Sequence, residues 1–136
     1  MKVVICEPGR YARIAEIEPT LKAEQEIVGG LIDCVYPWPD MVALVCNDEG
    51  KLNGMPLNRA LEDYDVIAGT FFLCGISGEN FCSLTEEQAA HYMNKFHAPE
   101  ILVQTPHGLL RLRTTPEQYK QLMNPDQPKH KRPYTR

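Results

Sequence analysis

The sequence predicts an α+β fold: a mainly antiparallel sheet with two packed helices, followed by a C-terminal hairpin and a short helix. Short apolar runs bounded by Gly and Pro indicate strands, and three segments begin with residues that favour helix starts. At 136 residues, the chain suits one main core. We expect a core domain at 1–98, an extension at 99–124 and a basic, disordered tail at 125–136.

The segment VVICEPGRYARIAEI predicts a β-hairpin, and a helix is expected after it. Pro8 and Gly9 fit the two central positions of a type II turn, because Pro presets φ and Gly tolerates positive φ. Pro19 fits the first turn of a helix that we expect to run through 20–28. Gly29 favours the left-handed conformation that commonly ends a helix. Residues 3–28 are therefore expected to form two strands and a helix.

The middle of the chain reads as strands separated by prolines. Pro37 and Pro39 divide LIDCVYPWP from MVALVCN, since Pro has no N–H to donate to a strand ladder. Trp38, between these prolines, is interpreted either as a packed corner or as an exposed aromatic contact. The most apolar segment, DVIAGTFFLCGI, is expected to form the central strand, with Gly69 marking a bulge or a close backbone approach.

Helix signals are clearest in the second half. Thr85 and Gln88 form a capping box in SLTEEQAAHYMNKF, which predicts a helix. Beyond it, ILVQTPHGLLRLRT predicts a second hairpin with its turn at 106–108. In TPEQYKQLM, Thr115 as N-cap and Gln118 as its partner predict a short helix.

Charge is unevenly distributed along the chain. The net charge is −4, but residues 101–136 carry seven Lys and Arg against two acids, whereas residues 1–100 carry seven against sixteen. An acidic body repels nucleic-acid phosphates, so any nucleic-acid contact would fall to the basic residues of 111–136, and we rank nucleic-acid binding last among the functions considered. No apolar run approaches the roughly 20 residues that span a bilayer, and the apolar stretch at 3–6 is too short for a signal peptide. We therefore expect no membrane partner.

The side chains that catalysis needs do not form a known pattern. Hydrolysis or group transfer requires a nucleophile with a base, a metal, or two carboxylates in different environments. None of the four histidines stands in a motif with Cys, Ser or an acidic residue. The five cysteines include no C-x-x-C pair, which argues against zinc and favours free thiols in a reducing cytoplasm. We expect a protein that is not an enzyme and holds no cofactor or metal.

The segment NDEGKLNGMPLNRAL, at 47–61, is rich in uncharged hydrogen-bonding side chains. Residues 47–50 have the pattern of a plain turn after a strand. The residues that follow are too irregular for a strand, and Asn58 and Arg59 offer an amide and a planar guanidinium suited to recognition. Two interpretations stay open: a loop whose Asn side chains cap their own backbone, or a loop that binds a ligand or partner.

Several motifs resemble domain-of-unknown-function family 3846. They are V-G-G at 28–30, N-x-E-G-K-L at 47–52, G-x-P-x-N at 54–58 and S-L-T at 83–85. The resemblance covers roughly residues 1–96 and implies an accessory protein of bacteriophages, conjugative elements or bacterial genomes. Roles implied by that setting include interference with host defence in the bacterial cytoplasm. The resemblance supplies no catalytic residues.

We therefore hypothesise a non-catalytic accessory binding protein, a homo-oligomer that sequesters a small anionic, nucleotide-type ligand to counter host defence. In the predicted site Arg59 meets the anion, Asn58 and Asn47 meet its polar edges, and Arg10 or Tyr11 closes the pocket. The alternative is a protein-binding inhibitor whose acidic surface mimics nucleic acid and occupies a basic groove on a host enzyme. That alternative predicts strongly salt-dependent association with a host protein.

Overall fold

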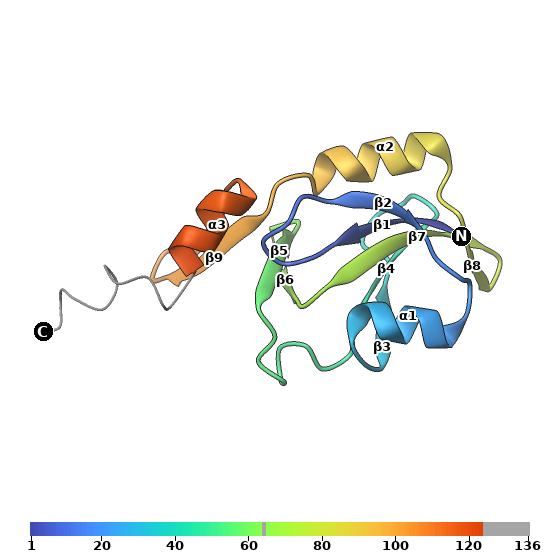
Figure 1. The fold of residues 1–136 in the computed structure, drawn as a ribbon, viewed down its shortest axis with the longest axis horizontal. Coiled ribbons are helices and arrows are strands. Elements are labelled where there is room, and N and C mark those ends of the chain that lie inside the picture. Colours follow the sequence, from blue (N-terminus) through green and yellow to red (C-terminus); the bar gives the residue numbers. More distant parts are fainter. Residues whose placement is uncertain (64, 124–136) are drawn as a thin grey trace, which may run out of the picture.

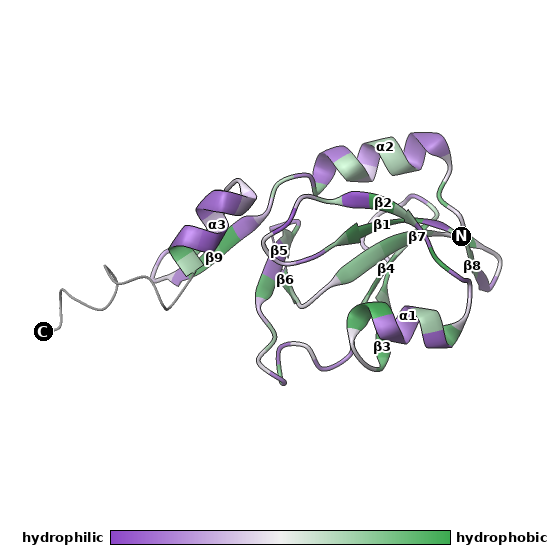
Figure 2. Ribbon diagram, viewed as in Figure 1, coloured by the Kyte–Doolittle hydropathy of each residue, from purple (hydrophilic) through white to green (hydrophobic). Residues whose placement is uncertain are grey.

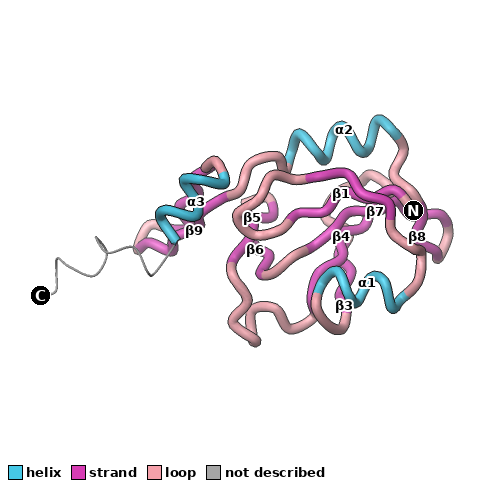
Figure 3. The backbone as a smooth tube through the Cα atoms, in the orientation of Figure 1, coloured by secondary structure: helices cyan, strands magenta, loops and turns pink. Residues whose placement is uncertain are grey.

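The computed structural model describes residues 1–63 and 65–123, and its centre is a six-stranded antiparallel sheet (Figure 3). The strand order is β2-β1-β7-β4-β3, with β8 paired to β7. These strands are β1 (Lys2–Cys6), β2 (Arg13–Glu16), β3 (Ile32–Val35), β4 (Val42–Asn47), β7 (Phe71–Ser77) and β8 (Asn80–Cys82). The predicted α+β class is confirmed.

The predicted N-terminal hairpin and first helix are both present. Strands β1 and β2 pair antiparallel, and Gly9 in the turn between them has a φ of 78°. Helix α1 (Leu21–Val28) follows, with the hydroxyl of Thr20 accepting a hydrogen bond at its N-terminus and Gly29 at a φ of 80° at its C-terminus. The local turn and capping signals therefore specify this region as predicted.

Helices α1 and α2 (Glu86–Lys95) cover opposite faces of the central sheet (Figure 1). Successive side chains of a strand point to opposite faces, so the neighbours Phe71 and Phe72 in β7 belong to different apolar clusters. Phe71 packs with Phe96 at the end of α2, and Phe72 belongs to the cluster that contains Val28 of α1. Strands β1, β4 and β7, which contribute to these clusters, are accordingly hydrophobic (Figure 2).

The apolar segment predicted as one central strand forms two strands instead. Strand β6 (Asp65–Ala68) ends at Gly69, and β7 begins at Phe71 in the middle of the sheet. Gly69 has a φ of 81°, and a Cβ there would lie 2.7 Å from the Met55 sulfur. The positive φ favours glycine, and this left-handed residue turns the chain between the two strands. The prediction of an unbroken strand is therefore wrong, although Gly69 does mark a close approach.

Part of the predicted 47–59 loop is also a strand. Residues 48–54 form turns, but Leu57–Leu61 forms β5, which pairs with β6 in a separate two-stranded sheet. Four of its five residues are buried, Asn58 and Arg59 among them. The prediction of a loop through residue 59 is wrong because tertiary contacts, and not an apolar pattern, stabilise this strand.

The C-terminal extension contains the predicted hairpin and helix. It consists of β9 (Glu100–Thr105), β10 (Gly108–Arg113) and α3 (Pro116–Met123), and it projects from the body of the molecule (Figure 1). The Thr115 and Gln118 side chains form the predicted capping box at the start of α3. The tail predicted at 125–136 lies outside the described residues. Within the described ranges, no helix has the length and apolar character needed to cross a membrane.

Candidate functional site

The Arg59 side chain is buried at the junction of three segments. It is 1% exposed, and its guanidinium makes five hydrogen bonds to oxygen atoms. Nε and Nη2 donate to the Phe96 carbonyl at 3.1 and 3.0 Å, and Nη2 also donates to the Arg10 carbonyl at 2.8 Å. Nη1 donates to Asn58 Oδ1 at 2.8 Å and to the Glu7 carbonyl at 3.5 Å. All five guanidinium N–H groups thus have internal partners.

This arrangement explains how the buried charge is tolerated. The Phe96 carbonyl lies at the C-terminus of α2, where the helix dipole places negative partial charge. Burial lowers the pKa of the Arg59 guanidinium, but a guanidinium remains protonated in proteins. Charged hydrogen bonds to carbonyl oxygens offset the cost of removing this group from water.

The other residues of the predicted site do not converge with Arg59 on a cleft. Asn58 is fully buried, and its Nδ2 donates to the carbonyls of Cys6 and Gly69, both at 2.8 Å. The Tyr11 ring stacks on His97 with 4.7 Å between ring centroids. Asn58 and Arg59 therefore hold β5 against the body, and in this conformation neither side chain is available to a ligand.

Arg10 and Asn47 line two different pockets. The Arg10 carbonyl binds Arg59, and the residue contributes to a pocket between the β1–β2 turn and α3. Asn47 donates from Nδ2 to the Val28 carbonyl at 3.1 Å and accepts from the Glu49 backbone at 2.8 Å. The Asn47 side chain thus caps the turn after β4. This agrees with the prediction that residues 47–50 form a plain turn. Of the five predicted residues, Asn47 is the one that lies beside the pocket described next.

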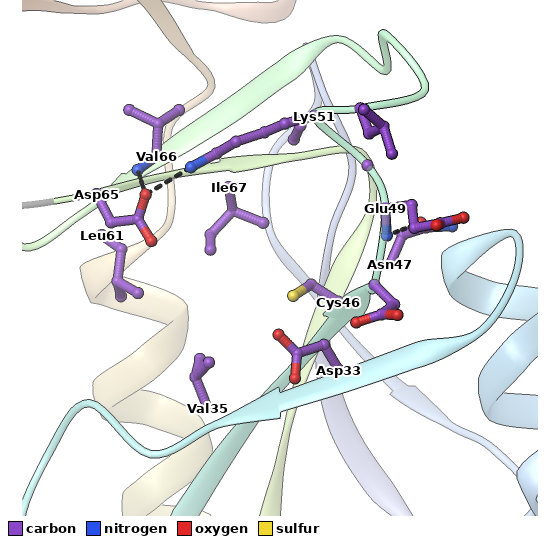
Figure 4. Close-up of a pocket in the computed structure, with 14 residues that line it drawn as sticks. Asp33, Val35, Cys46, Asn47, Glu49, Lys51, Leu61, Asp65, Val66 and Ile67 are labelled. Atoms are coloured by element: carbon purple, nitrogen blue, oxygen red, sulfur yellow. Dashed lines mark hydrogen bonds and ion pairs between the residues drawn. The ribbon is translucent and has the colours of Figure 1, made fainter.

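That pocket, here called the acidic pocket, lies between β3, the end of β4, the 48–52 turn and the β5–β6 hairpin (Figure 4). Its volume is about 320 Å³. The apolar lining comes from Val35, Cys46, Leu61 and Ile67, and the charged lining from Asp33, Asp48, Glu49, Lys51 and Asp65. Four carboxylates against one ammonium make the pocket suited to a positively charged group.

Lys51 already places an ammonium at the mouth of the acidic pocket. Its Nζ lies 2.6 Å from Oδ1 of Asp65, an oxygen that also accepts a hydrogen bond from the Val66 backbone at 2.7 Å (Figure 4). Partial burial acts to raise the pKa of Asp65, but these two hydrogen bonds outweigh it and lower the pKa. Both charged side chains are about half exposed, so a competing cation can reach the carboxylate.

The carboxylates around the acidic pocket also affect the pKa of Cys46, which lines the pocket. Its residue is 8% exposed, and burial together with the charges of Asp33, Asp65 and Asp48 raises the pKa of its thiol to about 11. A thiol held neutral in this way is a poor nucleophile at physiological pH. In the described part of the chain, no three His, Cys, Asp or Glu side chains are grouped to hold a metal ion.

A second pocket, here called the junction pocket, lies where the extension meets the body. Its volume is about 380 Å³, and its charged lining comes from Glu62, Asp63, Lys95, Glu100, Arg111 and Arg113. Glu100 is buried and accepts from the Ala60 backbone at 2.9 Å and from Arg111 at 3.1 Å. The junction pocket is thus balanced in charge, with most of its basic groups in ion pairs.

Trp38 and Glu62 connect the junction pocket to helix α2. The indole Nε1 of Trp38 donates to Glu62 Oε2 at 2.7 Å, and Lys95 Nζ lies 2.8 Å from the same oxygen. The Trp38 ring also packs on Tyr92, 4.8 Å between centroids. Of the two interpretations of Trp38, the packed corner is therefore the one observed.

Stability should depend on the ionisation of Glu62. Hydrogen bonds from Lys95 and then from Trp38 lower the pKa of Glu62 below its ordinary value of 4.5. A lowered folded-state pKa stabilises the protein above the unfolded-state pKa, and this contribution disappears as pH falls through the folded-state pKa. We expect Glu62→Gln to lower the free energy of unfolding at pH 7 by under about 1 kcal/mol, because the pair is partly exposed. Urea denaturation should show the difference shrinking as the pH falls below 4.5 and through the lowered folded-state pKa, whereas a difference that does not change with pH contradicts the assignment.

Comparison with protein-family models gives a match to the body of the protein and not to the C-terminal extension. The model of a domain of unknown function, DUF3846, matches residues 1–97. The chain belongs to the DUF3846 family. The comparison with curated proteins and the comparison with solved structures each found no match. The acidic pocket lies entirely within the DUF3846 region, whereas the junction pocket combines it with the extension.

Sequence reasoning missed most of the acidic pocket. Asp33 and Asp65 lie on strands far apart in sequence, and no local pattern associates them. The available signal was the acidic character of residues 1–100, together with Lys51 in a turn directly after Asp48 and Glu49. That signal favours a cationic ligand for this part of the molecule.

Proposed function

We propose that this DUF3846 protein is a non-catalytic binding protein whose acidic pocket takes a lysine or arginine side chain of a partner protein. The observation that carries the proposal is the pocket lining, in which four carboxylates and one lysine surround an apolar floor. The apolar side chains suit the aliphatic stem of the incoming residue, and the carboxylates suit its charged head. Of the two functions predicted from sequence, this is the protein-binding one.

The charge of the whole body supports the same proposal. Residues 1–100 carry sixteen acids against seven bases, so a basic surface is attracted before contact. This electrostatic attraction raises the association rate at low salt. At 0.1 M ionic strength it is largely screened beyond the Debye length of about 10 Å. Following the family resemblance, the partner we propose is a basic host defence protein in the bacterial cytoplasm, countered by a phage or mobile-element accessory factor.

The proposal is tested with a lysine-rich peptide, hexalysine, as the probe. In a two-dimensional NMR titration, we expect the amides of Lys51 and Val66 to shift first. Asp33→Asn with Asp65→Asn should weaken binding about tenfold, since two charged contacts are lost. The matched control is Glu86→Gln with Glu87→Gln, which removes the same charge from the exposed first turn of α2. Equal loss of affinity in both double variants would show that net charge, and not the pocket, attracts the peptide.

A second candidate is the small anionic, nucleotide-type ligand, and the junction pocket is the place that favours it. Lys95, Arg111 and Arg113 line this pocket. The Arg113 side chain is 72% exposed, and its nearest carboxylate contact, to Glu100, is 4.0 Å long. A long, exposed ion pair leaves guanidinium donors available for a phosphate.

Calorimetry against a panel of nucleotides tests this second candidate. Arg113→Gln is expected to remove the heat of binding, whereas Arg13→Gln, also an exposed arginine, should not. The absence of heat with every nucleotide for the unmodified protein would reject the candidate. Substitution of Arg59 does not serve as a test of binding, because its guanidinium holds the fold together.

A further inference from the structure

Strand β3 is one of the two edges of the central sheet. It lies at the end of the strand order and, among the described residues, pairs with β4 alone. Three of its four residues are partly exposed, and the fourth, Asp33, is exposed. A strand edge of this kind presents N–H and C=O groups that can pair with another strand. The outer side of β3 is therefore a place where an extended peptide can add to the sheet.

The pairing with β4 identifies the backbone groups of β3 that are free. The Asp48 N–H donates to the Leu31 carbonyl at 2.8 Å, so these two residues form a hydrogen-bonded pair of the antiparallel ladder. Hydrogen-bonded pairs alternate along such a ladder, so every second residue from Leu31 faces β4. The N–H and C=O groups of Ile32 and Cys34 consequently point away from β4. No other backbone group of the described residues is bonded to them.

The two faces of this edge differ in chemistry. Asp33 and Val35 lie on the face that lines the acidic pocket, and Figure 4 shows the Asp33 carboxylate directed from β3 toward that pocket. Ile32 and Cys34 lie on the opposite face, in the apolar cluster beneath α1. Within the described ranges, no basic side chain forms an ion pair with Asp33. A strand that pairs with this edge thus meets an unpaired carboxylate on one face and apolar side chains on the other.

We propose that the partner segment is an extended strand that pairs antiparallel with the free edge of β3, an inference that rests on the proposed function. Its basic residues lie on the pocket face and its apolar residues on the face beneath α1. Main-chain hydrogen bonds to Ile32 and Cys34 supply affinity for any extended chain, and the acidic pocket selects the basic residue. The recognised pattern is therefore an alternation of basic and apolar residues, and not positive charge in general.

The basic residue directly opposite Asp33 is the one that enters the acidic pocket. Because Ile32 and Cys34 make the new hydrogen bonds, Asp33 takes a non-hydrogen-bonded position in the new ladder, where opposite side chains lie closest. The Cβ atoms of directly opposite residues are about 4.5–5.5 Å apart. The stem of a lysine or arginine exceeds this distance, so its charged head extends past Asp33 toward the other carboxylates that line the pocket.

The other occupants and the other edge fit less well. A second copy of the chain has no basic residue in β3. The symmetric pairing that joins Ile32 of one copy to Cys34 of the other sets two Asp33 side chains directly opposite each other, and opposite like charges destabilise a sheet. At the far edge of the sheet, β2 contributes no residue to the acidic pocket, and its exposed Arg13 repels a basic peptide.

Two N-methylated forms of one peptide test the proposal. The probe is the capped hexapeptide Val-Lys-Val-Lys-Val-Lys, whose valines pair with Ile32 and Cys34 when a lysine lies opposite Asp33. Only the valine amides then donate to β3, so N-methylation of all three valines should weaken binding by about tenfold or more in an NMR titration. N-methylation of all three lysines gives the same mass and charge, and should change the affinity by less than about threefold. Equal losses for the two forms would overturn the strand pairing.

Amide hydrogen exchange of the full chain locates the contact. With saturating unmethylated peptide, the amides of Ile32 and Cys34 should exchange at least about tenfold more slowly than in the free protein, because they gain hydrogen bonds. The amides of Asp33 and Val35 already donate to β4 and serve as the matched control, with little change expected.

The outcomes separate this proposal from the proposed function. Peptide-induced shifts at Lys51 and Val66 without slower exchange at Ile32 and Cys34 would reject the strand pairing and leave the proposed function standing. No response at any of these four amides would reject both. Slow exchange of Ile32 and Cys34 in the protein alone, together with a mass twice that of the chain in sedimentation equilibrium, would assign the edge to a second copy and overturn the proposal.

Discussion

Replacing Arg59 with methionine is expected to lower the free energy of unfolding by about 3–5 kcal/mol. The methionine fills much of the same volume but donates no hydrogen bonds. It leaves the carbonyl oxygens of Phe96, Arg10 and Glu7 without their partner inside the protein, at about 1–3 kcal/mol for each that stays buried. The dipole at the end of α2 also loses the charge that complements it. Urea denaturation followed by far-UV circular dichroism measures the difference.

Two further variants separate the guanidinium from general effects of substitution. Arg59→Lys keeps the charge, but a single ammonium cannot reach the carbonyls of both the β1–β2 turn and the end of α2, so we expect about half of the loss. Arg10→Met removes an exposed side chain whose residue contributes its carbonyl to the network, and should change stability by under about 0.5 kcal/mol. If Arg59→Met stayed within about 1 kcal/mol of the unmodified protein, the buried guanidinium would not be the main link between these segments.

Elements with local signals were predictable from sequence. The capping boxes that begin with Thr85 and Thr115 are observed with both of their hydrogen bonds. The Pro8–Gly9 turn and the end of α1 at Gly29 also formed as predicted, because positive φ at glycine is a property of a few neighbouring residues. Both hairpins follow from turn residues between apolar runs.

Strand β5 and the acidic pocket could not be predicted in the same way. The β5 sequence LNRAL contains an asparagine and an arginine, which a local reading assigns to a loop. The hydrogen bonds that bury Arg59 reach Phe96, 37 positions later. Likewise, Asp33 and Asp65 meet at one pocket only because β3 and β6 belong to two sheets that the fold brings together. Three-dimensional contacts, and not propensities, determine both features.

Replacing Phe72 with alanine is the second change with a large expected effect, again about 3–5 kcal/mol. Phe72 is fully buried in β7, between Ile5 of β1 and Val45 of β4. Its ring lies in the cluster beneath α1, together with Val28. Alanine removes the ring and leaves a cavity that neighbours on three strands cannot fill without distorting the sheet. Thermal and urea denaturation measure the loss.

The size of the Phe72 effect depends on the ring being enclosed, and two controls examine this. Phe72→Leu leaves a smaller cavity and should cost about 1–2 kcal/mol. Phe81→Ala removes the same kind of ring from β8, where the side chain is only partly buried at the edge of the same cluster. This variant should lower the free energy of unfolding clearly less than Phe72→Ala does.

Because β7 carries Phe71 toward α2 and Phe72 toward α1, both helices depend on one strand. Phe72→Ala should therefore unfold the sheet and both helices in a single transition, and a separate early transition of α1 would show that the two faces are not one cooperative unit.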